Sequence, residues 1–297
     1  MHLVVGGSSG FLGTHLTREL GARGHTVTRL VRRAPQAEDE SRWDPASGMV
    51  DAAVIEAADV VVNLAGAPTA GNPHSQKWAD ALRESRVAST RTLASAIAAS
   101  ERTPAFLAGN GISVYGDHGS EPLTESADSR GDSLLTEVSQ VWGAAATPAR
   151  EAGARVCIIR TAPVMDRRSQ PLKSLRVLFG LGLGGRLGSG EQYFPMISLR
   201  DWVGGVVHLA EHDDAGGAFN FCCPVTPTNA EFTKALGHAL SRPAVIPVPA
   251  FAINLAASRM APELLGSING VPQALVDAGY EFHDRDVEGV LAAGLGH

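Results

Sequence analysis

The chain has few lysines, few cysteines and no long apolar run. Lys77, Lys173 and Lys234 are the only lysines among 297 residues, so arginine carries most of the positive charge, and the net charge is −6. This acidic balance argues against a surface for nucleic acid or another polyanion. No stretch is long and apolar enough to cross a membrane, and no basic segment followed by an apolar one marks a leader. We therefore expect a cytoplasmic protein without membrane contact.

Three cysteines are too few for a disulfide framework. Cys157 lies in an apolar run, and Cys222 and Cys223 are adjacent on an expected strand. No His or Cys lies near this pair at the spacing of a metal site, so we expect buried thiols and no bound metal. Hydrophobic residues make up 44% of the chain, which is enough for a globular protein with a large core.

The chain opens with a short apolar segment that leads into a glycine-rich turn. Residues 2–6 are predicted as a strand and residues 11–23 as a helix, and Gly7, Gly10 and Gly13 recur at every third position. In a dinucleotide-binding turn, glycines let the backbone bend tightly and let a pyrophosphate approach the N–H groups that begin the next helix. The order of strand, turn and helix predicts such a site. A glycine turn without a ligand is the alternative.

Strand-like and helix-like segments alternate over the first half of the chain. Helices are predicted at 77–100 and 134–152, the second with a break near Pro148. Apolar runs predict further strands at 25–31, 59–65, 105–110 and 155–160, with a short one at 41–44. Continuous apolar strands that alternate with helices predict an α/β fold with a doubly wound, parallel sheet of the Rossmann type.

The rest of the chain divides the predicted fold into three parts. We expect a dinucleotide-binding core at 1–165, to which strands and helices return from about 195–245, and a small helical appendage at 246–297. Between them, residues 166–195 form a glycine-rich lid or substrate loop, since six of the eleven residues from 180 to 190 are glycine. A flexible surface loop is the alternative. Thr228 and Glu231 have the spacing of a capping box, and Asp201 is predicted to cap a helix.

The end of the second strand distinguishes NAD from NADP. An acidic residue there binds the ribose 2′-hydroxyl, whereas an arginine pairs with a 2′-phosphate. Arg32 and Arg33 follow this strand directly, and no acidic residue comes before Glu38. We predict NADP(H) as the cofactor, with Arg32 as the phosphate ligand and Arg33 as its helper. A solvated basic turn is the alternative.

Several motifs together resemble the extended short-chain dehydrogenase/reductases. They are the glycine turn, Asn63-Leu-Ala-Gly66 and Val114-Tyr-Gly116. Within that superfamily the chain resembles an epimerase-like branch that is often labelled as sugar-nucleotide epimerases. The residues that carry this finer match include Trp43-Asp-Pro, Lys77-Trp78, Ser85-Arg86-x-x-x-Thr90, Asp201 and the glycine-rich segment 182–190. Val248-Pro-Ala-Phe251 opens a tail similar to the C-terminal domain of unknown function in that branch.

The resemblance implies where a cofactor would lie. The residues expected to bind it are Gly7, Ser8, Ser9, Gly10, Phe11, Leu12, Gly13, Arg32, Arg33, Leu64, Ala65, Gly66 and Val164. Of these, Leu64, Ala65 and Gly66 would flank the adenine-side ribose and the phosphates, and Val164 would lie near the nicotinamide. By analogy with the superfamily, helices 77–100 and 134–152 could also form the seam of a homodimer.

The Tyr-x-x-x-Lys pair of the superfamily is missing. In that pair the tyrosine exchanges a proton with the substrate, and the lysine lowers its pKa. The three tyrosines are Tyr115, Tyr193 and Tyr280, and the residues four positions after them are Gly119, Ile197 and Asp284. In the helix that should carry the pair, Val138 and Trp142 take the two places, and Trp142 packs either on the cofactor or in the core. The serine position is altered too, because Gly111 stands four residues before Tyr115.

Three interpretations stay open. The protein is an NADPH-dependent reductase or epimerase of an unidentified small molecule, with an unusual proton donor among Tyr115, Ser113, Asn110 and Arg86. Alternatively, Tyr115 only packs at a strand end, Arg86 is a charge on a helix surface, and the protein is a non-catalytic NADPH-binding regulator or scaffold. In the third interpretation the fold binds another nucleotide or a protein partner. The resemblance of the glycine-rich loop to a lid favours the enzyme.

Overall fold

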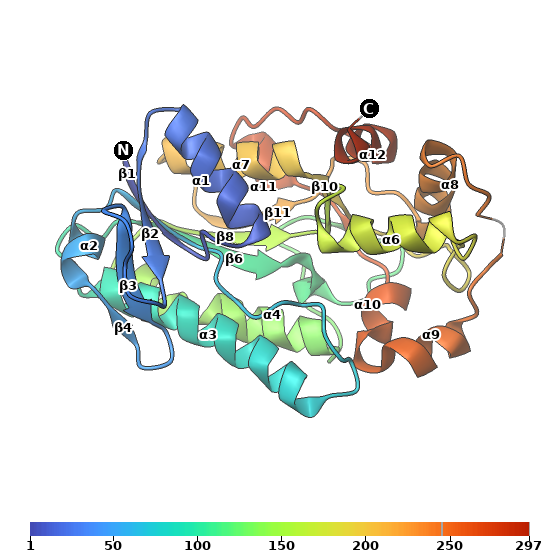
Figure 1. Ribbon diagram of the computed structural model, residues 1–297, viewed down its shortest axis with the longest axis horizontal. Coiled ribbons are helices and arrows are strands. Elements are labelled where there is room, and N and C mark those ends of the chain that lie inside the picture. Colours follow the sequence, from blue (N-terminus) through green and yellow to red (C-terminus); the bar gives the residue numbers. More distant parts are fainter. Residues whose placement is uncertain (245, 297) are drawn as a thin grey trace.

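The computed structural model describes residues 1–244 and 246–296, and its centre is an eight-stranded sheet (Figure 1). Seven strands are parallel, and only the strand at one edge runs antiparallel to its neighbour. The strands lie in the order β11 (Gly217–Phe221), β8 (Val156–Thr161), β6 (Ala105–Gly111), β5 (Val60–Asn63), β1 (His2–Gly6), β2 (Thr26–Val31), β3 (Glu40–Asp44) and β4 (Met49–Val50). The order reverses between β1 and β5, which confirms the predicted Rossmann-type sheet. Ligands bind outside the carboxyl ends of the strands at such a reversal.

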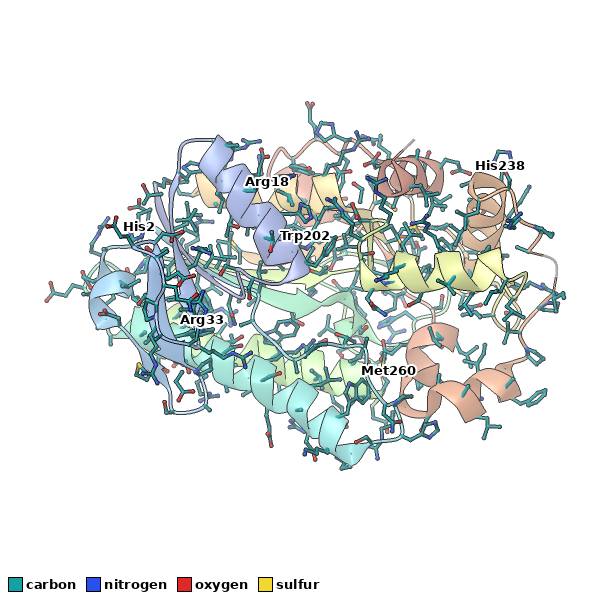
Figure 2. All side chains as sticks on the ribbon, viewed as in Figure 1. His2, Arg18, Arg33, Trp202, His238 and Met260 are labelled. Atoms are coloured by element: carbon teal, nitrogen blue, oxygen red, sulfur yellow. The ribbon has the colours of Figure 1, made fainter. Side chains whose placement is uncertain are left out.

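Helices cover both faces of the sheet (Figure 1). One face carries α1 (Phe11–Ala22), α7 (Leu199–Glu211) and α11 (Gln273–Asp277), and the other carries α2 (Ala52–Glu56), α3 (Gln76–Ala98), α4 (Leu134–Ala144) and α5 (Thr147–Glu151). Side chains of β1 alternate between the two cores, with Leu3 and Val5 in the first and Val4 in the second. Trp202 of α7 is fully buried in the first core (Figure 2). Both faces of β1 are therefore apolar, as expected for a central parallel strand.

Local signals set several helix ends. The predicted helix at 134–152 is broken into α4 and α5, and Pro148 lies in the first turn of α5, where its missing N–H removes no helix bond. The predicted capping box is confirmed, since Thr228 caps α8 (Asn229–Ala239) and Glu231 bonds back to it. The prediction that Asp201 caps a helix is wrong. Ser198 caps α7, and Asp201 lies inside its first turn.

A second, smaller core lies beyond the carboxyl ends of the strands, at the right of Figure 1. It is formed by β9 (Val164–Met165), β10 (Ile197–Ser198), α6 (Gln170–Gly180), α8 and α12 (Val287–Leu295). The C-terminal region further contains α9 (Ala250–Ala257), a 3₁₀ turn (Ser258–Met260), α10 (Ala261–Leu265) and β12 (Asn269–Gly270), which pairs with β7 (Pro122–Leu123). This region is mainly helical, as predicted. Of its last two helices, however, α11 packs into the core that contains α1 and α7, and α12 packs into the smaller core. The division into three parts stays a prediction.

Asp201 holds the C-terminal region to α7. Its side chain is fully buried and accepts hydrogen bonds from the Tyr280 hydroxyl at 3.0 Å, from the His283 amide at 2.9 Å and from the Asp284 amide at 2.8 Å. The neighbouring Arg200 forms an ion pair with Asp284. A buried carboxylate with three donors of this kind fixes the chain segment that supplies them.

The glycine-rich segment is attached to the start of the C-terminal region. Residues 181–190 contain no helix or strand. The Gly188 amide nevertheless donates to the Val248 carbonyl at 2.9 Å, and the Val248 amide donates to the Arg186 carbonyl at 2.8 Å. The Leu187 amide donates to Asn229 Oδ1 of α8 at 2.8 Å. Residues 186–188 are therefore bonded to Val248 on one side and to α8 on the other, unlike the flexible surface loop that was the alternative.

Candidate functional site

Each glycine of the opening turn has a different steric role. Gly7 has a φ of +80°, and a Cβ there would lie 2.6 Å from the Leu64 carbonyl carbon. A Cβ on Gly13 would lie 2.2 Å from the Gly7 oxygen, so α1 packs directly on the turn. Gly10 has no neighbour closer than 3.3 Å and leaves the outer side of the turn open. Tight bending, close helix packing and an open approach are what a dinucleotide turn requires.

The N-terminus of α1 has no side-chain cap. Gly10 occupies the capping position, and no acidic residue lies in the first turn of the helix. In contrast, Ser75 caps α3 and Ser133 caps α4 with side-chain oxygens. The first N–H groups of α1 therefore remain available beside the reversal of the strand order. They lie at the positive end of the helix dipole, where an anion such as a phosphate binds.

The residues around this turn differ in exposure. Ser8 is buried, Ser9 is exposed, and Phe11 and Leu12 are half-buried. The loop after β5 lies against the turn at Leu64 and Ala65. Asn63 is fully buried and orients this loop, because its Oδ1 accepts from the Ala65 amide at 3.1 Å while its Nδ2 donates to Thr90 Oγ1 at 2.9 Å. Asn63 belongs to the sequence motif, but only its hydrogen bonds to Ala65 and Thr90 show that it orients the loop.

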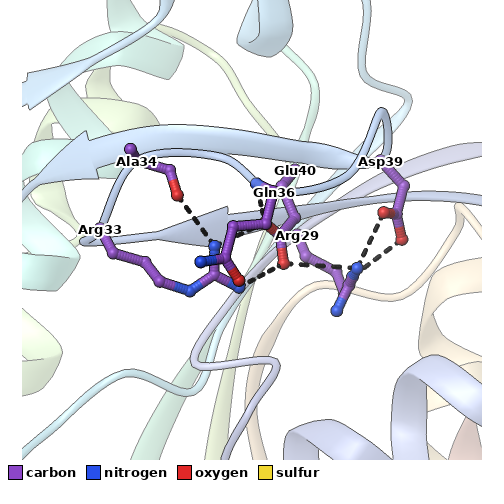
Figure 3. A network of polar contacts seen from close by, with 6 residues as sticks. All are labelled: Arg29, Arg33, Ala34, Gln36, Asp39 and Glu40. Carbon is purple, nitrogen blue, oxygen red and sulfur yellow. Dashed lines mark hydrogen bonds and ion pairs between the residues drawn. The ribbon is translucent and has the colours of Figure 1, made fainter.

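The two predicted phosphate ligands, Arg32 and Arg33, have different surroundings. Figure 3 shows Arg33 donating to both carboxylate oxygens of Glu40, at 2.8 and 2.7 Å, and Arg29 donating to Asp39. Arg32 is exposed and makes no hydrogen bond or ion pair with any residue that the structure describes. It is therefore the available cation directly after β2, whereas Arg33 would have to leave Glu40 to assist it.

Glu40 is held as a carboxylate by its donors. The hydrogen bonds from Arg33, followed by the bond from the Gln36 amide at 2.8 Å, lower the pKa of the Glu40 carboxyl to about 2. The negative charge of Glu40 is thus present over the whole physiological range, and it is neutralised by Arg33. Of the three acidic residues between Arg32 and β3 or at its start, Asp39 pairs with Arg29 and Glu40 pairs with Arg33, whereas the exposed Glu38 has no hydrogen bond or ion pair to a described residue.

Tyr115 lies in the interior, which fits the packing alternative for this residue. Its ring is 1% exposed, its hydroxyl lies 2.7 Å from Asn220 Oδ1, to which it donates, and Arg160 donates to the hydroxyl at 2.6 Å. Burial raises the pKa of the Tyr115 hydroxyl, the opposite of what a proton-donating tyrosine needs. Asn220 also donates to the Val271 carbonyl at 2.9 Å. Tyr115 therefore belongs to a buried network that holds the C-terminal region, and its hydroxyl is not accessible to a substrate.

The other two polar candidates, Asn110 and Ser113, lie at the carboxyl end of β6 and directly after it. Asn110 is 4% exposed, its amide nitrogen donates to the Ser139 carbonyl at 3.1 Å, and its oxygen accepts from the Gly111 amide. Ser113 is half-buried in the 3₁₀ turn η1 (Ile112–Tyr115), directly after β6. Its hydroxyl has no hydrogen-bond partner in the described part of the chain. Ser113 is thus the candidate whose hydroxyl is available.

The two residues expected in place of the Tyr and Lys, Val138 and Trp142, both pack against other side chains or the sheet. Val138 is 2% exposed. Trp142 lies over Gly109 of β6, where a Cβ would be 3.2 Å from the indole, and its Nε1 donates to Thr90 Oγ1 of α3 at 2.9 Å. The guanidinium carbon of Arg86, which comes from α3, lies over the Trp142 ring, 5.1 Å from the ring centre. Arg86 is therefore directed into the space between α3 and α4, unlike the exposed helix charge that was the alternative.

Val164 and the three cysteines are buried. Val164 is 7% exposed in β9, directly beyond the end of β8. Cys157, Cys222 and Cys223 are each fully buried, which confirms their predicted place in the core. Among residues 1–244 and 246–296, no group of three or more His, Cys, Asp or Glu side chains could hold a metal ion. No helix within these ranges is long and apolar enough to span a membrane.

A parallel sheet with this strand order, a glycine turn and an uncapped helix at the reversal define a Rossmann-type protein of the extended short-chain dehydrogenase/reductase class. Residues 3–222 match the model of the NAD dependent epimerase/dehydratase family, and the chain belongs to this family. Residues 248–293 match a domain of unknown function.

Similar proteins cover the whole chain. Epimerase family protein Mb2239 of Mycobacterium bovis is 37% identical over 286 residues, which are 96% of this chain and 94% of that protein. The crystal structure of human epimerase family protein SDR39U1 (isoform 2) with NADPH superimposes with a TM-score of 0.88 at 30% identity, and covers 100% of this chain and 99% of that one. A nucleoside-diphosphate sugar epimerase from Corynebacterium glutamicum gives a TM-score of 0.80 at 31% identity, over 100% of this chain and 58% of that chain.

The close packing of α1 on the glycine turn makes a prediction for stability. Gly13→Ala should lower the free energy of unfolding by about 1–3 kcal/mol, because the new methyl group must displace the Gly7 carbonyl. Gly21 in the same helix has no atom within 4 Å of an added Cβ, so Gly21→Ala should raise this free energy by about 0.5–1 kcal/mol. Urea unfolding followed by circular dichroism measures both. A Gly13→Ala variant as stable as the parent would contradict the packing.

The ion pair of Glu40 predicts a pH dependence. A carboxyl whose pKa is lower in the folded than in the unfolded chain stabilises the fold above its unfolded pKa of about 4.3, and this stabilisation is lost as the pH falls toward the folded value of about 2. Glu40→Gln should therefore lower the free energy of unfolding at neutral pH, by an amount that shrinks below about pH 4.

The matched control is Glu38→Gln. Glu38 is exposed and has no hydrogen bond or ion pair to a described residue, so this change should alter stability little at any pH. Urea unfolding at a series of pH values compares the variants with the parent. An effect of Glu40→Gln that is the same at acid and neutral pH would show that the pair with Arg33 does not form.

Proposed function

We propose that the protein binds NADP(H) at the carboxyl edge of its sheet. The observation that carries this proposal is the exposed Arg32 after β2, without a partner among the described residues, beside the uncapped N-terminus of α1. The amides of α1 would bind the pyrophosphate, and Arg32 would bind the 2′-phosphate. Leu64, Ala65 and Gly66 would flank the adenine-side ribose, and Val164 would lie near the nicotinamide. The human relative solved with NADPH supports the choice of cofactor.

We further propose a reductase or epimerase activity on a small molecule, carried out without the Tyr-x-x-x-Lys pair. When bound, the cofactor supplies the hydride donor or acceptor. Ser113 is the residue of this chain that would bind the substrate oxygen, because its hydroxyl is available directly after β6. Asn110 would keep η1 in place through its bonds to Ser139 and Gly111. Proton transfer through a lone serine should be slow compared with a Tyr/Lys enzyme.

A non-catalytic NADPH-binding protein is the second candidate. It is favoured by a specific observation, namely that both hydrogen-bonding functions of the Tyr115 hydroxyl are used inside the protein. In addition, Val138 and Trp142 fill the places of the acid and its lysine with packing side chains. In this case the cofactor would stabilise a conformation that a partner recognises.

The cofactor proposal predicts a preference that depends on Arg32. NADPH should bind about tenfold or more tightly than NADH, and Arg32→Ala should remove the difference because the 2′-phosphate loses its cation. Arg33→Ala should have a smaller effect, since Arg33 already pairs with Glu40. Arg83→Ala, an exposed site on α3, is the control for loss of one positive charge. Fluorescence titration measures all four affinity ratios, and equal affinities of the parent for the two cofactors would refute the choice of NADPH.

The catalytic proposal predicts that removal of the Ser113 hydroxyl lowers the reaction rate, whereas removal of the Tyr115 hydroxyl lowers the stability of the fold. With a panel of aldehydes and ketones, Ser113→Ala should lower the rate of NADPH oxidation by about 10²-fold or more. Tyr115→Phe should leave this rate within about threefold but lower the free energy of unfolding by about 1–3 kcal/mol, because Asn220 and Arg160 lose a buried partner. A larger rate loss in Tyr115→Phe than in Ser113→Ala would reverse the assignment. Because an epimerase consumes no NADPH overall, the non-catalytic candidate is favoured only if the parent binds NADPH, oxidises it with no compound of the panel and also epimerises none of a set of nucleotide sugars followed by NMR.

A further inference from the structure

Arg86 is a half-buried cation without an anion. Its guanidinium lies between α3 and α4, against Gly66, where a Cβ would be 3.2 Å from its side chain, and over the indole of Trp142. In the described part of the protein no carboxylate lies within 4.0 Å of it. Burial alone lowers the pKa of the guanidinium to about 10, so it is charged at neutral pH. A charge that is largely withdrawn from water without a counter-charge lowers the stability of a fold. A ligand that supplies the counter-charge would remove that penalty.

The hydrogen bonds of Arg86 leave two donors unused. Nη1 donates to the carbonyls of Ala67 and Leu82, both at 3.1 Å, and Nη2 donates to Thr69 Oγ1 at 3.0 Å. Of the five N–H groups of a guanidinium, this leaves the Nε–H and one hydrogen of Nη2. The buried side-chain nitrogens without a partner in the described ranges are Trp78 Nε1 and His118 Nδ1. Arg86 Nε is not among them, so it remains in contact with solvent.

The position of Arg86 separates it from the groups expected to bind the cofactor phosphates. Two of those groups, the N-terminus of α1 and Arg32, follow β1 and β2, and the third, Leu64 to Gly66, follows β5. Gly66 is the last residue expected to flank the cofactor on the β5 side, and Trp142 lies one strand further, over Gly109 of β6. Ser113 follows the same strand β6. Arg86 and Ser113 are thus both on the side of the crevice where the substrate would bind.

We propose that Arg86, supported by the Trp142 indole, binds an anionic group of the substrate, a carboxylate or a phosphate. This inference rests on the proposed function and names its substrate class, an anionic small molecule. A planar guanidinium with two free donors forms paired hydrogen bonds to either group. The three existing bonds to Ala67, Leu82 and Thr69 fix the guanidinium before the ligand arrives. Less conformational freedom is then lost on binding.

The test uses malonate and inorganic phosphate as probes of the full chain at saturating NADPH, which blocks the anion sites at α1 and Arg32. In isothermal titration calorimetry, the parent should bind at least one of the two anions, and Arg86→Gln should weaken this binding about tenfold or more. Arg83→Gln, an exposed change on the same helix, should leave it within about twofold. The tighter of malonate and phosphate identifies the group. A parent that binds neither anion, or equal binding by Arg86→Gln, would overturn the proposal.

Two further variants separate a binding role from a structural one. Arg86→Lys keeps the charge but loses the paired donors, so it should fold and show intermediate anion affinity. Trp142→Phe keeps an aromatic surface under the guanidinium and should retain most of the binding. Loss of anion binding in Trp142→Phe but not in Arg86→Lys would contradict the assignment.

The cofactor affinity decides whether the anion belongs to the substrate. Arg86→Gln should bind NADPH within about twofold of the parent, whereas a tenfold loss would assign the anion to the cofactor and overturn the proposal. If the parent does not bind NADPH at all, the proposed function fails. The comparison of Arg86→Gln with Arg83→Gln toward malonate, made without cofactor, still decides whether Arg86 binds anions.

Discussion

The contact between Gly13 and the carbonyl of Gly7 determines where the site lies. Because Gly13 has no Cβ, α1 packs directly on the turn that follows β1. The first amides of α1 therefore lie beside the reversal of the strand order. The same turn lies against Leu64, so the loops after β1 and β5 have one relative position. Asn63 and its bonds to α3 then extend this arrangement toward Arg86 and Trp142.

Features that depend on neighbours in the sequence could be predicted. The glycine turn, the helix break before Pro148 and the capping box at Thr228 each involve residues within a few positions of one another. Partners that lie far apart could not be predicted in this way. Tyr115 forms its hydrogen bond to a residue 105 positions later, so its sequence motif gave no sign that the hydroxyl is already used. Similarly, the sequence around Asp201 gave no sign that its carboxylate accepts hydrogen bonds from Tyr280 and Asp284, about 80 positions later, while Ser198 caps the helix.

The residue expected in place of the lysine, Trp142, contacts two other elements. The indole of Trp142 fills the space over β6 and connects α4 to α3 through Thr90, while Arg86 brings a positive charge to the other part of that indole. Val138, the residue expected in place of the tyrosine, is part of the core, and the Ser113 hydroxyl after β6 is available.

The attachment of residues 186–188 to Val248 has a mechanical consequence. Two backbone hydrogen bonds join this segment to the residues just before α9, and Ser133 at the start of α4 donates to Glu263 of α10. The glycine-rich segment and the C-terminal helices are thus one connected unit, and the Ser133–Glu263 hydrogen bond ties that unit to the start of α4.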